Sequence, residues 1–397
     1  MELSRRVQAI KPSPTLAVTA RAAALKASGR DIIGLGAGEP DFDTPQHIKD
    51  AAIGAINAGF TKYTAVDGTP SLKAAVIAKF KRDNGLDYTP RQILVSCGGK
   101  QSFFNLAQAV INAGDEVIIP APYWVSYPDI VLLADGKPVI VEAGIEQGFK
   151  ITPAQLEAAI TPKTRLFVIN SPSNPTGAVY TGDELAALGA VLRKHPQVLI
   201  ASDDMYEHIR LNDVPFVNIL NVCPDLYDRT LVLNGVSKAY SMTGWRIGYA
   251  AGPETIMRAM TNVQSQSTSN PTSISQVAAE AALNGDQGCI TPMLDAFKTR
   301  HRYVVDALNA LPGFHCVDSG GAFYAFPDVR DAIMNLLARD IIEAPTDIAF
   351  SEYLLESADV AVVPGSAFGA EGYIRLSFAT SQANLDKALK RIAQALA

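Results

Sequence analysis

The sequence contains short apolar runs that alternate with longer segments of helical periodicity. The runs that predict buried strands cover residues 93–96, 117–120, 166–170, 198–201 and 231–233. Helical patterns lie between them, at residues 97–112, 153–160 and 181–194. Apolar runs separated by helices predict an α/β fold, in which a parallel sheet is connected by crossover helices.

The last hundred residues show a different pattern. A helical pattern over residues 291–310 leads into shorter apolar runs at residues 323–326, 360–365 and 373–378. Alternation along the last run puts Arg375 on the face opposite Ile374 and Leu376. We therefore expect a long helix that connects the first domain to a second, smaller one.

Bulk composition excludes several classes of partner. The chain has 397 residues, of which 48% are hydrophobic and 19% charged, as in an ordinary globular protein. Its formal net charge of −6 offers no basic surface for nucleic acid, and no apolar window reaches the length of a membrane span. The four cysteines are too sparse for a disulfide scaffold and no signal peptide is visible, so we expect a cytoplasmic protein.

Polar residues follow three of the predicted strands at the point where each strand ends. They are Asn174, Asp203, Tyr206, Ser237, Lys238 and, slightly further along, Arg246. Because ligands bind outside the carboxyl ends of parallel strands, we expect these side chains to gather at one edge of the sheet. A lone loop lysine is ordinarily a solvated surface residue, and only this company favours a functional role for Lys238.

These residues match the chemical requirements of pyridoxal 5′-phosphate (PLP). The cofactor needs a lysine amine to bind its aldehyde and a carboxylate beside its pyridine nitrogen, which Lys238 and Asp203 can supply. Asn174 and Tyr206 can donate hydrogen bonds to the ring oxygen, and Arg246 can neutralise the phosphate. The sequence therefore predicts a PLP site at this edge.

A second feature of the same kind is the glycine pair before Lys100. Backbone N–H groups of Gly99 at a helix start favour an anion such as a phosphate monoester, whereas the spacing of a P-loop is absent. Lys100 is either a solvated lysine or a ligand-binding one, and its unfavourable place in the helix dipole supports the second interpretation. Trp124, after the run at residues 117–120, can stack on a flat ring or serve a structural role.

Three motifs resemble one known family. The segments S-P-S-N-P-T-G, S-D-D-M-Y-E and S-K-A-Y-S-M-T-G-W-R-I-G-Y, in this order, are similar to the class I and II aminotransferases of PLP fold type I. The similarity is greatest to the bacterial aspartate and prephenate aminotransferase subgroup, and it covers nearly the whole chain. It implies a large α/β domain at residues 46–290, with a mostly parallel seven-stranded sheet flanked by helices. It also implies a smaller α+β domain formed from residues 1–45 and 291–397, and a homodimer with shared active sites.

The resemblance assigns roles that the residues alone leave open. It places Gly38 and Arg375 at the substrate carboxylate, Lys100 at a distal carboxylate, and Trp124 on the pyridine ring. It implies that Tyr63 reaches the cofactor phosphate of the partner subunit. Plainer interpretations stay open, namely surface packing for Tyr63 and an internal salt bridge for Arg375.

We therefore expect a PLP-dependent aspartate aminotransferase that uses aspartate, glutamate and their 2-oxo acids, with Lys238 as the catalytic residue. Asn174 and Trp124 are expected to contact the substrate as well as the cofactor. In the subgroup a basic residue in this N-terminal segment accompanies prephenate use, so Lys11 implies prephenate as a substrate, alone or beside oxaloacetate, whereas an exposed lysine is the plainer interpretation. The alternative functions are a glutamate/aspartate-prephenate aminotransferase and an aromatic amino acid aminotransferase.

Three other classes compete with an aminotransferase. A PLP-dependent lyase shares the cofactor residues, and fold alone does not separate it from an aminotransferase. A ligand sensor within a transcription regulator has no spare residues here for a DNA-binding module. A metal hydrolase is disfavoured because the five histidines lack ligand spacing, so no metal is expected.

Overall fold

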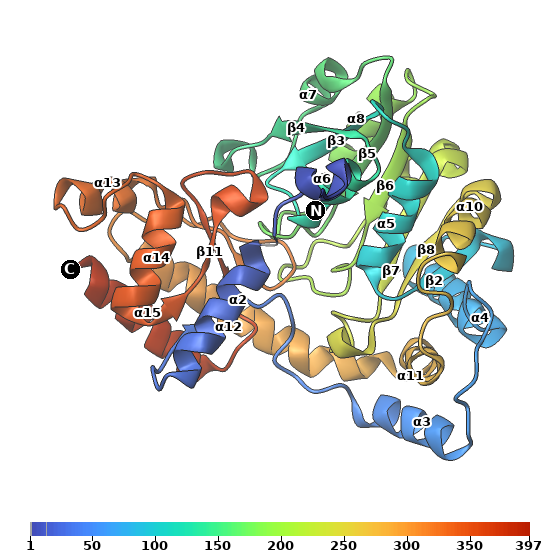
Figure 1. Cartoon of the computed structure of the whole chain (residues 1–397), viewed down its shortest axis with the longest axis horizontal. Helices are drawn as coiled ribbons and strands as arrows, with labels where there is room; N and C mark the ends of the chain where they lie inside the picture. The colour runs from blue at the N-terminus through green and yellow to red at the C-terminus, as the bar shows by residue number, and fades with distance from the viewer. Residues whose placement is uncertain (1, 13) are drawn as a thin grey trace.

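The computed structural model describes residues 2–12 and 14–397, and its centre is a seven-stranded sheet (Figure 1). In spatial order the strands are β2 (Ile93–Ser96), β8 (Gly248–Ala251), β7 (Thr230–Gly235), β6 (Leu199–Asp203), β5 (Thr164–Asn170), β3 (Glu116–Ala121) and β4 (Lys137–Glu142). Only β8 runs antiparallel to its neighbours β2 and β7, among the strands of this sheet that the structure describes. The expected α/β fold with a mostly parallel seven-stranded sheet is therefore confirmed.

Helices cover both faces of the sheet, which explains why its central strands are apolar at successive positions. In β5, Leu166 and Val168 pack into one buried cluster, whereas Phe167 and Ile169 pack into another. The first face is covered by α5 (Gly99–Val110), α6 (Ser126–Leu133) and α10 (Glu254–Ser265), and the second by α4 (Pro70–Lys79), α8 (Gly182–Leu192) and α11 (Ser273–Asn284). Because helices cover both faces of the sheet, the ends of the strands are where a ligand can bind.

A second group of elements comes from both ends of the chain. β1 (Ile33–Gly34) pairs in parallel with β10 (Val360–Ala361). β12 (Ile374–Ser377) lies between β11 (Val363–Pro364) and β9 (Tyr324–Ala325), antiparallel to both. The helices of this group are α2 (Pro14–Ala27), α12 (Thr291–Asn309), α13 (Arg330–Ala338), α14 (Asp347–Ala358) and α15 (Gln382–Leu396).

The ends of the chain thus pack together, as Figure 1 shows for α2 beside the C-terminal helices. α12 is the long connecting helix that the sequence predicts. The domain boundaries at residues 45 and 290 stay predictions. The remaining helices are α1 (Arg5–Ala9), α3 (Gln46–Asn57), α7 (Pro153–Ala159) and α9 (Ile219–Val222).

Two strands, β4 and β8, do not stand out in the sequence. β4 reads K-P-V-I-V-E and lies at the edge of the sheet, where its residues are half-buried or exposed, so its pattern is weak. β8 is a buried G-Y-A-A segment, too short and too small in its side chains to be distinguished from a loop. Among the described residues, no helix is both long and apolar enough to cross a membrane.

Candidate active site

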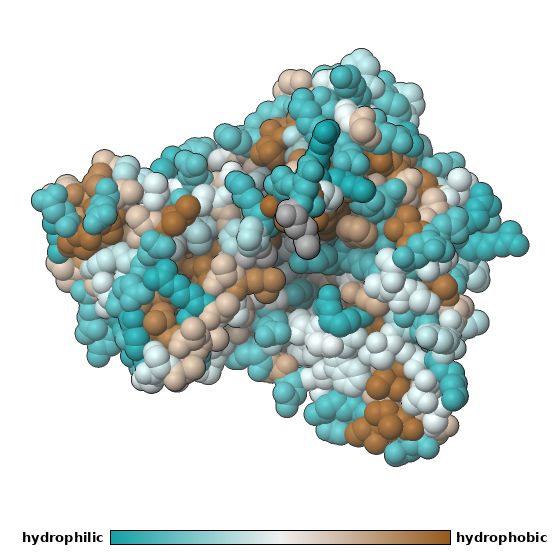
Figure 2. Space-filling model, viewed as in Figure 1, coloured by the Kyte–Doolittle hydropathy of each residue, from teal (hydrophilic) through white to brown (hydrophobic). Residues whose placement is uncertain are grey.

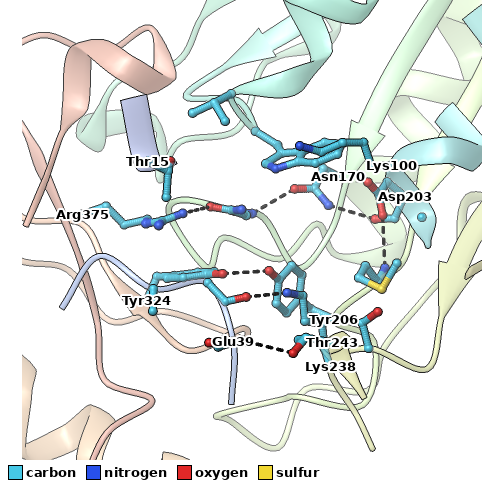
Figure 3. Close-up of a pocket in the computed structure, with 18 of the residues that line it drawn as sticks. Thr15, Glu39, Lys100, Asn170, Asp203, Tyr206, Lys238, Thr243, Tyr324 and Arg375 are labelled. Carbon is cyan, nitrogen blue, oxygen red and sulfur yellow. Dashed lines mark hydrogen bonds between the residues drawn. The ribbon is translucent and has the colours of Figure 1, made fainter. Parts of the chain in front are cut away.

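The carboxyl ends of β5, β6 and β7 border a pocket of about 400 Å³ (Figure 3). Its lining includes Gly38, Gly99, Lys100, Trp124, Asn174, Asp203, Tyr206, Ser237, Lys238, Arg246 and Arg375. The polar residues that follow three different strands therefore meet in one place, as expected for parallel strands. The individual roles assigned to them remain predictions.

Lys238 lies three residues beyond the end of β7 and is not a solvated surface lysine. Its Nζ donates a hydrogen bond to the carbonyl oxygen of Gly38 at 2.5 Å and lies 5.8 Å from the centre of the Tyr206 ring. Burial, reinforced by the positive charge of Arg375, lowers the pKa of Lys238 to about 8. A substantial fraction of neutral amine is therefore present near neutral pH.

Asp203 ends β6 and points into the same pocket, where Figure 3 shows it beneath Asn170 and Lys100. The Tyr127 hydroxyl donates to its Oδ2 at 2.5 Å, and the backbone N–H of Met205 donates to its Oδ1 at 3.3 Å. Burial raises the pKa of Asp203, and the hydrogen bond from Tyr127 opposes that rise. The site thus holds a carboxylate that is removed from bulk water but supplied with donors.

The hydroxyl groups of two tyrosines meet on the other side of the pocket. The hydroxyls of Tyr206 and Tyr324 lie 2.9 Å apart, and both side chains are buried. Asn174 is held nearby, because its backbone N–H donates to the side-chain oxygen of Asn170 at 2.9 Å. Asn170 in turn donates to the backbone carbonyl of Asp203 at 3.0 Å, which ties the end of β5 to the end of β6.

A cradle for an anion forms where α5 begins. Gly98 has φ of +90°, and a Cβ on it would lie 2.5 Å from Nη2 of Arg246. A Cβ on Gly99 would likewise lie 2.5 Å from Cε of Met205. Gly98 therefore lets the helix N-terminus approach the Arg246 guanidinium closely, and Gly99 leaves room for Met205. Backbone N–H groups and a cation thus converge as a phosphate requires.

Arg375, in β12, is the most deeply buried charge of the pocket, with 2% of its surface exposed. It donates to Oδ1 of Asn174 at 2.8 Å and to the carbonyl oxygen of Gly36 at 2.7 Å, and its guanidinium lies 4.5 Å from the Tyr324 ring centre. Its Nε has no hydrogen-bond partner in the part of the chain that the structure describes.

The possibility of an internal salt bridge for Arg375 is wrong. No described aspartate or glutamate forms an ion pair with its guanidinium, whose nearest fixed contacts are an amide, a carbonyl and aromatic rings. Burial lowers the pKa of Arg375, but a guanidinium stays charged at any ordinary pH. A buried cation without a fixed anion is suited to a carboxylate ligand.

Lys100 and Trp124 border the pocket together. Nζ of Lys100 lies 5.3 Å from the centre of the Trp124 ring, and burial together with the charge of Arg246 lowers the pKa of this lysine. Lys11 and Tyr63 do not line the pocket. Lys11 is exposed beside Asp129 of α6, and Tyr63 has 92% of its surface exposed.

Behind the pocket, the buried carboxylate of Glu207 links two strand ends and is paired with a buried lysine. The Glu207 carboxylate forms an ion pair with Lys79 and accepts hydrogen bonds from Asn84 at 2.7 Å and from Asn234 at 2.8 Å. Glu207 follows Tyr206 in the turn after β6, and Asn234 belongs to β7. The hydrogen bond from Asn234 to Glu207 therefore fixes the turn that carries Tyr206 relative to the strand that leads to Lys238.

Several pocket residues escaped the sequence-based prediction. They are Thr15, Glu39, Asn170 and Tyr324, together with Thr243, whose hydroxyl donates to Glu39 at 2.9 Å. Tyr127, behind the pocket, was also missed, although its hydroxyl donates to Asp203. Asn170 and Glu39 adjoin recognised motifs, so proximity in sequence could have indicated them. Tyr127 has no such signal and is indistinguishable in the sequence from an ordinary core aromatic residue, because Asp203, which it contacts, is 76 residues away along the chain.

Comparison with known proteins agrees with this geometry. The family model for aminotransferase class I and II matches residues 30–392. The chain is 69% identical over 396 residues to an aspartate/prephenate aminotransferase of Nitrosomonas europaea, with 100% of both chains covered. It is 54% identical over 393 residues to an aspartate aminotransferase of Geobacillus stearothermophilus, covering 99% of this chain and 98% of that protein.

Two solved structures with a similar fold are also aminotransferases. The aspartate aminotransferase of Rhizobium meliloti matches with a TM-score of 0.94 and 50% identity, covering 100% of this chain and 99% of that one. The aspartate aminotransferase of Thermus thermophilus with maleate matches with a TM-score of 0.93 and 45% identity over 100% of both chains. From its fold, its pocket and these similarities, the chain belongs to the class I and II aminotransferase family.

Proposed function

We propose that this protein is a PLP-dependent aminotransferase that moves an amino group between L-aspartate or L-glutamate and 2-oxo acids, and that it also accepts prephenate. The observation that carries the proposal is Arg375, a buried guanidinium without a carboxylate partner, in the same pocket as Lys238 and Asp203. Relatives named aspartate/prephenate aminotransferase support the substrate range. The structure of the Thermus thermophilus aspartate aminotransferase supports it too, because that enzyme was solved with maleate, a dicarboxylate.

The residues present fit PLP. Lys238 would hold the aldehyde carbon, Asp203 the pyridine nitrogen, and Asn174 with Tyr206 the ring oxygen. The phosphate would occupy the cradle at the start of α5, against Ser237 and Arg246, where glycines leave the room that a Cβ would fill. When bound, the cofactor supplies an electron sink for negative charge at the α-carbon of the substrate.

The residues of the chain itself perform binding, orientation and proton transfer. Arg375 binds the α-carboxylate through two parallel N–H donors, which fixes the α-carbon relative to Lys238. Nζ of Lys238, neutral in part of the molecules because of burial, takes the α-proton and later returns it. Lys100, at the rim, binds a distal carboxylate, so substrates with two carboxylates gain a second contact.

A coupled assay with glutamate as amino donor tests the substrate range. Oxaloacetate and prephenate are expected to be converted faster than phenylpyruvate and pyruvate, because only the first two carry the second carboxylate. Lys238→Ala should abolish turnover and the absorption of the lysine-bound cofactor. Equal rates for all four acceptors would contradict the proposed role of the second carboxylate, and turnover in Lys238→Ala would contradict the catalytic assignment.

A homodimer with shared active sites is part of the same proposal. Tyr63 lies outside the pocket of its own chain with 92% of its surface exposed. Tyr63 follows α3, in which Ile53 and Ile56 are exposed, and Phe60 just after the helix is exposed as well. Figure 2 shows an apolar patch over this helix. A second copy that covers this patch would bring Tyr63 to the cofactor phosphate of its partner.

Mixed subunits test that arrangement. Tyr63→Ala and Lys238→Ala should each be nearly inactive as pure dimers. In a mixed dimer, one site combines an intact Lys238 with an intact Tyr63 from the other subunit, so mixing after mild dissociation should restore roughly a quarter of wild-type activity. Absence of any recovery, with mixed dimers demonstrated by mass spectrometry, would overturn the shared site.

We also assign the protein to the cytoplasm. The four cysteines, Cys97, Cys223, Cys289 and Cys316, are free, which suits a reducing compartment. Thiol titration of protein that is purified and unfolded without reductant should find all four, and a disulfide formed in the cell would speak against this location.

A further inference from the structure

Tyr127 is the second residue of α6, and its side chain is almost completely buried, with 1% of its surface exposed. It does not line the pocket, and lies behind two residues that do. Its hydroxyl donates to Oδ2 of Asp203 at 2.5 Å, and its ring meets the Trp124 ring edge to face, with centres 5.1 Å apart. One side chain thus contacts both the acid and the flat aromatic group of the site.

From this arrangement we infer that Tyr127 is a positioning residue for the cofactor, which holds Asp203 ionised and correctly rotated and supports Trp124 from behind. The inference rests on the proposed function, since both supported groups are assigned to the cofactor ring there. It adds a residue that touches neither substrate nor cofactor.

The hydrogen bond has a defined direction. Burial and the neighbouring Asp203 raise the pKa of Tyr127 well above its ordinary value, so its hydroxyl stays protonated and donates. A carboxylate that accepts hydrogen bonds is stabilised in its charged form, and in a buried place this offsets the loss of water. An ionised Asp203 is what a protonated pyridine nitrogen requires as a partner.

The ring of Tyr127 is itself held by its surroundings. It packs against Phe103 of α5 with ring centres 4.8 Å apart, and its backbone N–H donates to the carbonyl oxygen of Trp124 at 3.0 Å. Aromatic pairs in this edge-to-face geometry restrict each other's rotation. The hydroxyl of Tyr127 is therefore presented to Asp203 by a rigid frame.

Tyr127→Phe tests the inference because it removes one oxygen and leaves the ring in place. In the purified holoenzyme, the dissociation constant of the cofactor should rise roughly tenfold to a hundredfold, the range expected for a lost hydrogen bond to a charged group. The absorbance titration of the lysine-bound cofactor should shift in pH, because the charge of Asp203 acts on the ring. The value of kcat should fall roughly tenfold, while KM for aspartate stays within about twofold.

Tyr88→Phe is the matched control. Tyr88 is a buried tyrosine with 7% of its surface exposed, it does not line the pocket, and its hydroxyl has no hydrogen-bond partner among the described residues. It should leave the absorbance titration and cofactor retention unchanged. If Tyr88→Phe shifts them as much as Tyr127→Phe does, the effect belongs to general packing and the inference fails.

A double-mutant cycle decides whether Tyr127 acts through Asp203. In an Asp203→Asn background, Tyr127→Phe should have little further effect on cofactor dissociation or on the absorbance titration. A full additional effect in that background, or a wild-type titration in the single variant, overturns the inference. A wild-type protein that shows no lysine-bound cofactor absorbance would instead overturn the proposed function, so the two failures are distinguishable.

Discussion

Lys238 should behave as a neutral amine far more often than an ordinary lysine. Burial, reinforced by the charge of Arg375, lowers its pKa from 10.5 to about 8. At pH 7 a group with a pKa of 8 is neutral in roughly 10% of molecules, whereas one with a pKa of 10.5 is neutral in roughly 0.03%. The pocket therefore raises the population of the reactive form about 300-fold.

This population can be measured as a rate. Protein stripped of cofactor is mixed with PLP in a stopped-flow instrument, and the appearance of the lysine-bound cofactor is followed by absorbance between pH 6 and pH 10. Because deprotonation produces the nucleophile, the rate should rise about tenfold per pH unit below pH 8 and level off above it. A rate that still rises about tenfold per pH unit up to pH 10, as for an ordinary lysine, would refute the idea that the pocket desolvates this amine.

Two variants separate the causes of the shift. Arg375→Gln removes the nearby positive charge but leaves burial in place, so the midpoint should move upward by part of the shift. Arg193→Gln, which removes an exposed arginine paired with Asp225 on the surface, should leave the midpoint unchanged. If Arg375→Gln has no effect on the midpoint, the electrostatic part of the reasoning is wrong.

Other variants probe the supports around the pocket. Lys79→Met leaves the buried Glu207 carboxylate without its cation, so urea unfolding should show a loss of about 3–5 kcal/mol in unfolding free energy, and unchanged stability would contradict the pairing. Gly98→Ala puts a Cβ where Arg246 lies and forces φ of +90° on a residue that disfavours it. Cofactor retention in dialysis should therefore fall about tenfold, and full retention would contradict a phosphate site at the start of α5. Arg375→Lys keeps the charge but loses the planar pair of donors, so KM for aspartate should rise about 100-fold while cofactor absorbance is retained, and an unaltered KM would exclude Arg375 as the carboxylate ligand.

Sequence patterns predicted the parts of the fold that have strong local signals. The buried strands and the residues directly after them were predictable, because apolar runs and strand ends mark both Asp203 and Lys238. β4 and β8 were not, since one is a half-exposed edge strand and the other is built from small residues. Local pattern therefore identified the centre of the sheet better than its less regular strands.

Contacts across the chain were the harder part of the site. Nothing near Tyr127 in sequence indicates that its hydroxyl meets Asp203, and nothing near Arg375 indicates that it lacks an acid partner. Both facts depend on which segments pack side by side in three dimensions. Residue chemistry could name candidates, but only the packed structure separates a salt bridge from a free guanidinium.

The two hydrogen bonds of Arg375 have a consequence for biosynthesis. One joins it to Asn174 of the central region, and the other to Gly36 near the start of the chain, although Arg375 itself emerges late from the ribosome. The residues expected to hold the cofactor within one chain all precede residue 247, so a growing chain completes that half of the pocket first. Recognition of the amino acid is then the final feature to be assembled, when the C-terminal strand closes against the oldest part of the polypeptide.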